Sequence, residues 1–229
     1  MGTGLKKNVR VLAEKLWRED EFRDWMKTLG NDPKRPPIFF EGNAGRVYFF
    51  EKTVIKISVS PVETRVADFL CQDPTYHFLE VRQFEECSAI FSKRLDLPRT
   101  PKEIKRSADL LMTFADNFPV CRTEGFPPDC YQKVRKEFSH YPVCPVSFQK
   151  VLERHGALFE KTGYFHDDGG YHNVGLYQDR VVFTDLGPNR TIDLNEEKIL
   201  ETIDNTIKNV PAVPPRFEHS REVDPRPWW

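Results

Sequence analysis

The segment 166–187, HDDGGYHNVGLYQDRVVFTDLG, places two acidic loops on either side of a predicted β-hairpin. Its expected strands are Val174–Tyr177 and Val181–Thr184, joined by a short polar turn. Because a hairpin of this size returns the chain to its starting point, Asn173 and Asp185 are predicted to lie together. An amide oxygen and a carboxylate are hard ligands of the kind that hold Mg²⁺ together with nucleotide phosphates. The segment therefore predicts a magnesium–nucleotide site.

A third polar residue of this segment, Asp168, lies five positions before Asn173 on the loop that follows a helix predicted from Ser147 to about Thr162. A carboxylate in that place would face an incoming hydroxyl. The alternative is that both acidic loops are ordinary surface turns.

The residues before position 96 are typical of a small antiparallel sheet interrupted by one helix. Ser60-Pro61-Val62-Glu63 is a capping box with proline at the first helical position, and it predicts a helix to about Leu70. The expected strands are short, β-branched and aromatic: Pro37–Glu41, Val47–Glu51, Val54–Ser58, Phe78–Phe84 and Ser88–Leu95. The predicted order is β-β-β-α-β-β, and the later residues are mainly helical, so the fold class is α+β.

Two features of this sheet suit a phosphate ligand. Gly42 and Gly45 lie in the turn between the first two strands, where glycine lets backbone N–H groups approach phosphate oxygens. Lys56 interrupts an apolar strand. Each feature alone is also compatible with a simple hairpin turn or a solvent-facing lysine.

The ends of the chain have their own patterns. Apolar residues at helical spacing predict one amphipathic helix over residues 5–29, which Gly30 ends. Another helix is expected over Asn195–Asn209, followed by a Pro-rich tail, and residues 117–146 give no prediction. The predicted divisions are an N-terminal extension, a sheet unit, a helical unit and the tail, at 1–36, 37–96, 97–209 and 210–229.

Composition excludes several classes of protein. The 229 residues carry 34 Lys and Arg against 35 Asp and Glu, which argues against a nucleic-acid binder. No apolar run is long enough to span a membrane. The five cysteines favour reduced thiols in the cytoplasm, or in a host cytosol if the protein is an exported effector. A zinc set of Cys121, Cys130, His140 and Cys144 is the weaker alternative, because its spacing matches no common finger.

The motifs, taken together and in this order, resemble those of the protein-kinase-like superfamily. That family has a catalytic loop His-x-Asp-x-x-x-x-Asn and a metal motif Asp-Phe-Gly. Here the corresponding residues are His166-Asp167-Asp168 with Asn173, and Asp185-Leu186-Gly187. The resemblance covers roughly residues 37–209 and implies a bilobal fold, with a sheet-based N-lobe and a minimal, mainly helical C-lobe.

The resemblance implies a role for each matched residue. Gly42, Gly45 and Lys56 would contact the phosphates of ATP, and Asn173 and Asp185 would hold Mg²⁺. Asp168 would be the catalytic base. Backbone groups of the hinge would bind adenine, beside a pocket lined by Ile90 or Phe91; the expected hinge residues are Ser92, Lys93 and Arg94.

Several residues depart from the family pattern. The only candidate to pair with Lys56 is Glu63, seven residues on, and its carboxylate could instead bond the Ser60 N–H of the capping box. Gly170 replaces the usual basic residue after the catalytic aspartate, and neither a long activation loop nor Ala-Pro-Glu follows Gly187.

The size is similar to that of small bacterial effector kinases, lipopolysaccharide-sugar kinases and antibiotic phosphotransferases. We expect a kinase acting on Ser or Thr of a protein substrate, because the last two groups usually carry a different acidic motif after the hairpin. The alternatives are a small-molecule or sugar kinase, a nucleotide-binding pseudokinase, a nucleotidyl transferase and an unrelated α+β binding protein.

Overall fold

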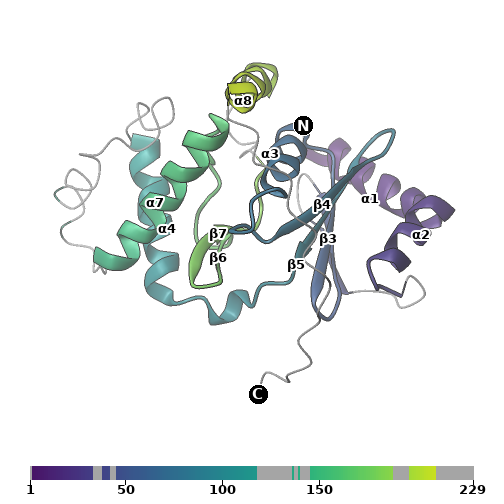
Figure 1. Ribbon diagram of the computed structural model, residues 1–229, viewed down its shortest axis with the longest axis horizontal. Coiled ribbons are helices and arrows are strands. Elements are labelled where there is room, and N and C mark those ends of the chain that lie inside the picture. The colour runs from purple at the N-terminus through teal and green to yellow at the C-terminus, as the bar shows by residue number, and fades with distance from the viewer. Residues whose placement is uncertain are drawn as a thin grey trace.

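The computed structural model describes residues 2–32, 38–41, 45–117, 136, 139, 145–187 and 196–209. Within these residues the chain is α+β, with a five-stranded antiparallel sheet, a two-stranded sheet and six α-helices (Figure 1). Gly42, the cysteine–histidine set of residues 121–144 and the tail 210–229 lie outside the described residues. No helix in the described part of the chain is long and apolar enough to cross a membrane.

The five-stranded sheet has the order β1-β2-β3-β5-β4, and every neighbouring pair is antiparallel. Its strands are β1 Ile38–Glu41, β2 Gly45–Phe49, β3 Thr53–Ser58, β4 Phe78–Gln83 and β5 Ser88–Lys93. The helix α3, Pro61–Leu70, lies between β3 and β4 in the sequence, so the predicted β-β-β-α-β-β order is confirmed. The last strand of this sheet in the sequence, β5, lies between β3 and the edge strand β4.

The N-terminal segment forms two helices, α1 Gly2–Arg18 and α2 Asp20–Thr28, so the prediction of one helix was wrong. The break is at Glu19, whose backbone is extended (φ −72°, ψ 131°). The bend lets the apolar sides of both helices pack on the same face of the sheet. Their shared core with β2, β3 and β5 includes Leu16, Phe22, Trp25, Tyr48, Ile55, Ile57 and Phe91.

The helical half of the molecule is built around α4 Lys102–Asn117 and α7 Pro145–Thr162, which pack on the small hairpin of β6 Val174–Tyr177 and β7 Arg180–Phe183. A 3₁₀ turn, Leu97–Arg99, connects the sheet to α4. The last helix, α8 Glu196–Asn209, lies against α3 and α7. Figure 1 shows α1 and α2 on the side of the large sheet that faces away from this half.

A third core joins the sheet to the helical half. It contains Val66 and Leu70 of α3, Leu158 of α7, Phe183 at the end of β7, and Leu186 two residues after Thr184. Leu186 is 1% exposed, and it brings the segment after the hairpin against α3. The residues that carry the predicted chemistry lie along this junction.

Candidate active site

Strand alternation directs Lys56 toward the junction. Its neighbours Ile55 and Ile57 pack in the core formed with α1 and α2, so the Lys56 side chain leaves the sheet on the other face, toward α3. The side chain is 10% exposed. A lysine so deeply buried requires partners of opposite charge.

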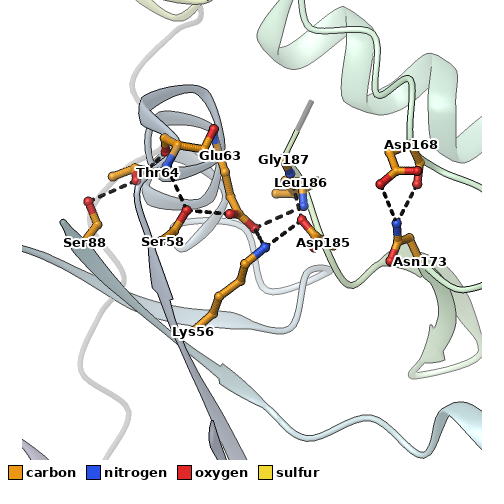
Figure 2. A network of polar contacts seen from close by, with 11 residues as sticks. Lys56, Ser58, Glu63, Thr64, Ser88, Asp168, Asn173, Asp185, Leu186 and Gly187 are labelled. Carbon is orange, nitrogen blue, oxygen red and sulfur yellow. Dashed lines mark hydrogen bonds and ion pairs between the residues drawn. The ribbon is translucent and has the colours of Figure 1, made fainter. Parts of the chain in front are cut away.

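Two carboxylates from separate segments bind the Lys56 ammonium. The Nζ atom lies 2.7 Å from Oε1 of Glu63 on α3 and 2.7 Å from Oδ1 of Asp185 after β7 (Figure 2). Burial disfavours the charged ammonium, but the two carboxylates outweigh it and raise the pKa of Lys56. The cluster joins β3, α3 and the end of the hairpin.

The start of α3 shows why Glu63 is available for this ion pair. The Ser60 hydroxyl accepts the Glu63 N–H at 3.3 Å, as a helix cap does. The reciprocal bond of the capping box is replaced, because the Ser60 N–H donates to Oγ of Ser58 at 3.1 Å. The Ser58 hydroxyl then donates to Oε2 of Glu63 at 2.7 Å. The Glu63 carboxylate is thereby directed to Lys56.

The two carboxylates differ in proton affinity. Burial raises the pKa of Glu63 to about 7, although Lys56 opposes the rise. Burial alone would also raise the pKa of Asp185, but the ion pair with Lys56 and the Gly187 N–H outweigh it and lower the pKa to about 2. Of the two carboxylates, Asp185 is therefore the one that stays ionised more readily at neutral pH.

Asp168 and Asn173 form a second polar pair beside this cluster. The Asn173 amide donates to the Asp168 backbone oxygen at 2.8 Å and to its carboxylate Oδ2 at 3.0 Å (Figure 2). The hairpin returns as predicted, since the Thr184 N–H donates to the Asn173 carbonyl at 2.9 Å. Gln178 and Asp179 make the reversal with positive φ angles of 50° and 59°. The end of the hairpin thus brings Asp185 next to the Asn173 loop.

The environment of Asp168 suits a general base. Burial raises its pKa to about 6, with further contributions from the negative charges of Asp185 and Asp167, while the Asn173 amide opposes the rise. A carboxylate with such a pKa is mostly ionised at neutral pH and has a higher proton affinity than an ordinary aspartate.

Two buried histidines pack against the Asp168 loop: His166, which belongs to the matched motif but was given no role of its own, and His155, which belongs to no motif. His166 is fully buried, and burial lowers its pKa to about 4. His155 of α7 is 2% exposed, and its ring stacks on Phe165 and packs against Phe183. A Cβ atom on Gly169 would lie 2.7 Å from Cε1 of His155. Nothing in the local sequence pattern of α7 indicates this contact.

Asp109 of α4 holds the outer side of the same loop. Its Oδ1 accepts the Tyr171 N–H at 2.5 Å, and the ammonium of Lys105 lies 4.7 Å from the centre of the exposed Tyr171 ring. Lys105 and Asp109 are one helical turn apart, so one edge of α4 follows the loop. Helical spacing alone could have suggested the edge but not its partner.

Of the two glycines predicted to contact phosphate, Gly42 and Gly45, the structure describes only Gly45. Gly45 begins β2, and a Cβ atom there would lie 2.7 Å from the Ile57 carbonyl and 2.8 Å from Cε of Lys56. Only glycine fits so close to the lysine, which is a packing reason for Gly45. Gly42 falls outside the described residues.

The predicted hinge residues lie at the end of β5. Ser92 is buried and pairs with Val54 and Phe78. The N–H groups of Lys93 and Arg94 donate to the carbonyls of His77 and Lys52, each at 2.9 Å. These two N–H groups are therefore engaged within the protein, so a bound adenine would need other backbone groups of the connection to α4.

The two residues expected beside adenine, Ile90 and Phe91, lie on opposite faces of the five-stranded sheet. Ile90 pairs with Lys56 and belongs to the core shared with α3, whereas the Phe91 ring packs edge-on against Trp25 of α2. Ile90 is thus the one on the face that carries Lys56.

The donor set at the junction fits a hard cation held jointly with phosphate oxygens. Among the described residues, no three His, Cys, Asp or Glu side chains converge as a metal site. Mg²⁺ bound with a nucleotide needs only one or two protein carboxylates; here Asp185 would supply a carboxylate and Asn173 an amide oxygen.

Comparison with known proteins identifies no relative of this chain. No protein-family model, no curated protein and no solved structure matches this chain.

Proposed function

We propose that this chain is an ATP- and Mg²⁺-dependent phosphotransferase with a bilobal, protein-kinase-like fold. The observation that carries the proposal is the buried lysine on the central strand bound at once by Glu63 and Asp185, beside the Asp168–Asn173 pair. The sheet order, with its single helix between β3 and β4, supports a kinase-like N-lobe. In this interpretation the core through Leu186 is the contact between the lobes.

The proposed chemistry follows from these positions. Lys56, oriented by Glu63, binds the phosphates of ATP, while Asp185 and Asn173 hold Mg²⁺, which neutralises phosphate charge when bound. Asp168 orients the acceptor hydroxyl and takes its proton. Phosphoryl transfer depends mainly on positioning and charge stabilisation, which these side chains supply.

The proposed acceptor is a Ser or Thr hydroxyl of a protein. A small-molecule or sugar acceptor is the second candidate, because only residues 188–195 separate Gly187 from α8. That span is too short for the long segment that forms the peptide platform in ordinary protein kinases. A pseudokinase that binds nucleotide without turnover is the third.

The direct test is Mg²⁺-dependent transfer of label from γ-labelled ATP to the protein itself or to a generic protein substrate. Asp185→Asn should remove transfer while the protein stays folded. Asp179→Asn is the matched control, because Asp179 is an exposed turn residue whose positive φ suits asparagine. Full transfer by Asp185→Asn would refute the assignment.

Further arms of this experiment separate the alternatives. Label incorporated from α-labelled ATP would indicate nucleotidyl transfer, and a thermal shift with Mg·ATP without turnover would indicate a pseudokinase. Mass spectrometry of a lysate treated with the protein and ATP distinguishes phosphorylated proteins from phosphorylated small molecules.

A further inference from the structure

A pocket of about 610 Å³ lies beside α3 and is not lined by Lys56, Asp168 or Asp185. Its walls come from the start of α3, from β4, β5 and the turn between them, and from Leu200 of α8. The pocket and the proposed active site share one structural element, because both are bounded by the segment that runs from Ser58 into α3.

The rim of the pocket is negatively charged. Asp68, Glu85 and Glu86 line it, with side chains 56%, 87% and 52% exposed. Among the described residues, Arg65 is the one cation that lines the pocket; it is bonded to Asp204 at 2.6 Å and lies 3.9 Å from the Asp68 carboxylate, which leaves Glu85 and Glu86 as the excess charge. The charge that remains at the rim favours a cationic ligand.

The protein itself shows that an ammonium suits this rim. Lys15 of α1 approaches Glu86 at 3.4 Å and Glu85 at 3.8 Å from outside the pocket. Lys15 is not among the residues that line the pocket, and the carboxylates of Glu85 and Glu86 remain 87% and 52% exposed.

The interior offers hydrogen-bond acceptors and apolar surface together. Hydroxyl and amide groups of Ser58, Ser60, Thr64, Gln83 and Ser88 line it, and so do the apolar side chains of Val59, Val81 and Leu200. Such a lining complements a donor-rich cationic head on an aliphatic stem.

The hydroxyl groups of the wall also hold Glu63 in place. Ser58 Oγ donates to Oε2 of Glu63 at 2.7 Å, and the Thr64 hydroxyl bonds the Ser60 carbonyl at 2.8 Å and Oγ of Ser88 at 3.0 Å. A ligand that contacts these hydroxyls would therefore restrict the first turn of α3. Because Glu63 lies in this turn and bonds Lys56, the ligand would also affect the site on the other side of the helix, and a ligand of that site would affect the pocket to the same extent.

We propose that this pocket binds an aliphatic ammonium or guanidinium group, and that its occupancy stabilises the first turn of α3 with Glu63 directed at Lys56. The source of the group is either a free amine of the polyamine type or a basic side chain of a protein. Binding itself does not depend on the proposed phosphotransferase activity, whereas any effect on turnover rests on it.

The test measures agmatine, which carries both head groups on one aliphatic stem, by calorimetry against the full chain without nucleotide. We expect saturable binding that weakens roughly tenfold in Asp68→Asn/Glu86→Gln, the effect of losing two partly exposed ion pairs. Glu160→Gln is the matched control, because Glu160 is an exposed glutamate of α7 that does not line the pocket. Absence of saturable binding to the wild-type chain, or equal binding by the double variant, would overturn the site.

Two further measurements complete the test. A blocked arginine peptide that binds more tightly than agmatine, with the same dependence on Asp68 and Glu86, identifies a protein source, and the reverse order identifies a free amine. Amide hydrogen exchange should slow at residues 60–64 when agmatine binds. Unchanged exchange there would overturn the coupling to Glu63. All these readouts remain informative if the protein transfers no phosphate.

Discussion

Gly169 lies against the ring of His155, and this contact allows a sharp test of how the Asp168 loop is positioned. An added Cβ atom would lie 2.7 Å from Cε1 and 2.9 Å from Nε2 of His155, and 3.2 Å from Cδ2 of His166. The His155 ring cannot retreat easily, because Phe165 and Phe183 pack around it with ring centres 5.6 and 4.4 Å away. In Gly169→Ala, the loop itself must therefore move.

The size of the effect follows from these distances. Restoring ordinary contact requires a shift of about 0.7 Å at the loop, immediately next to Asp168. Overpacking of this kind costs about 1–3 kcal/mol of stability. A displacement approaching 1 Å near the reacting groups can lower the rate by about 100-fold, so we expect a fall in kcat of roughly 10- to 100-fold with a smaller change in the KM for ATP.

The assay is steady-state phosphoryl transfer, with chemical denaturation of the same samples. His155→Ala placed in the Gly169→Ala background should return part of kcat, because it removes the atoms that the new methyl group meets. Gly156→Ala is the control, since its Cβ atom would meet nothing within 4 Å and alanine favours the helix. Normal kcat in Gly169→Ala, or no recovery in a folded double variant, would refute this account of the loop.

Other expectations concern charge and packing. Asp167→Asn removes a negative charge that raises the pKa of Asp168, so the acidic limb of the pH profile of kcat/KM should move to lower pH; an unmoved limb would exclude Asp168 as the group that titrates. In Lys56→Met, Glu63 loses the cation that opposes its raised pKa. The folded state then holds the Glu63 proton more tightly than the unfolded state does, so stability should fall with pH from about 4.5 upward to above 7, more steeply than in the wild type by urea denaturation at each pH. A parallel dependence in both proteins would contradict this. Trp25→Ala should cost about 3–5 kcal/mol by the same method, because the ring is 4% exposed and donates to Glu80 at 2.8 Å; a loss below about 1 kcal/mol would show that α2 contributes little to the sheet.

The sequence pattern predicts much of the sheet because its signals are local. Ile55 and Ile57 alternate with Lys56, which determines that the lysine leaves the sheet on the face opposite to the apolar pair. Ser60 and Pro61 specify the first turn of α3 within one residue. Hairpin geometry likewise brings Asn173 to the end of β7 without any information from the rest of the chain.

The partner of Glu63 could not be predicted in this way. A capping box and an ion pair to Lys56 are both compatible with the residues Ser60 to Glu63, so the local sequence allows two outcomes. The structure selects the ion pair because the Ser58 hydroxyl occupies the Ser60 N–H and also donates to the glutamate. That arrangement depends on Ser58 and Lys56 lying on the same face of β3, two residues apart.

The bend at Glu19 and the His155 contact are tertiary in origin. An apolar stripe that continues from Leu16 to Phe22 is compatible with one straight helix, and only the shape of the sheet beneath it favours two short ones. His155 and Gly169 are separated in the sequence by the end of α7 and a loop. No residue pattern indicates that the His155 ring occupies the space that a side chain at position 169 would need. Packing of this kind depends on which segments the fold brings together.

The three-residue cluster of Lys56, Glu63 and Asp185 needs a reason beyond stability. Buried ion pairs often contribute no more stability than apolar residues of the same volume, because removing charges from water costs several kcal/mol per ion. What the cluster does provide is a link between three segments, because the positions of β3, α3 and the segment after β7 depend on one another through these ion pairs. Glu63 contacts both the lysine and, at 3.4 Å, the Leu186 N–H, so a displacement of α3 would release the strand and the segment after the hairpin together.

Because the other side of the first turn of α3 forms the wall of the acidic pocket, a ligand there would act on both contacts through a single helix. The proposed catalytic residues and the proposed cation pocket are thus linked by about one turn of helix, and the hydrogen-exchange and turnover experiments test the two sides of that turn separately.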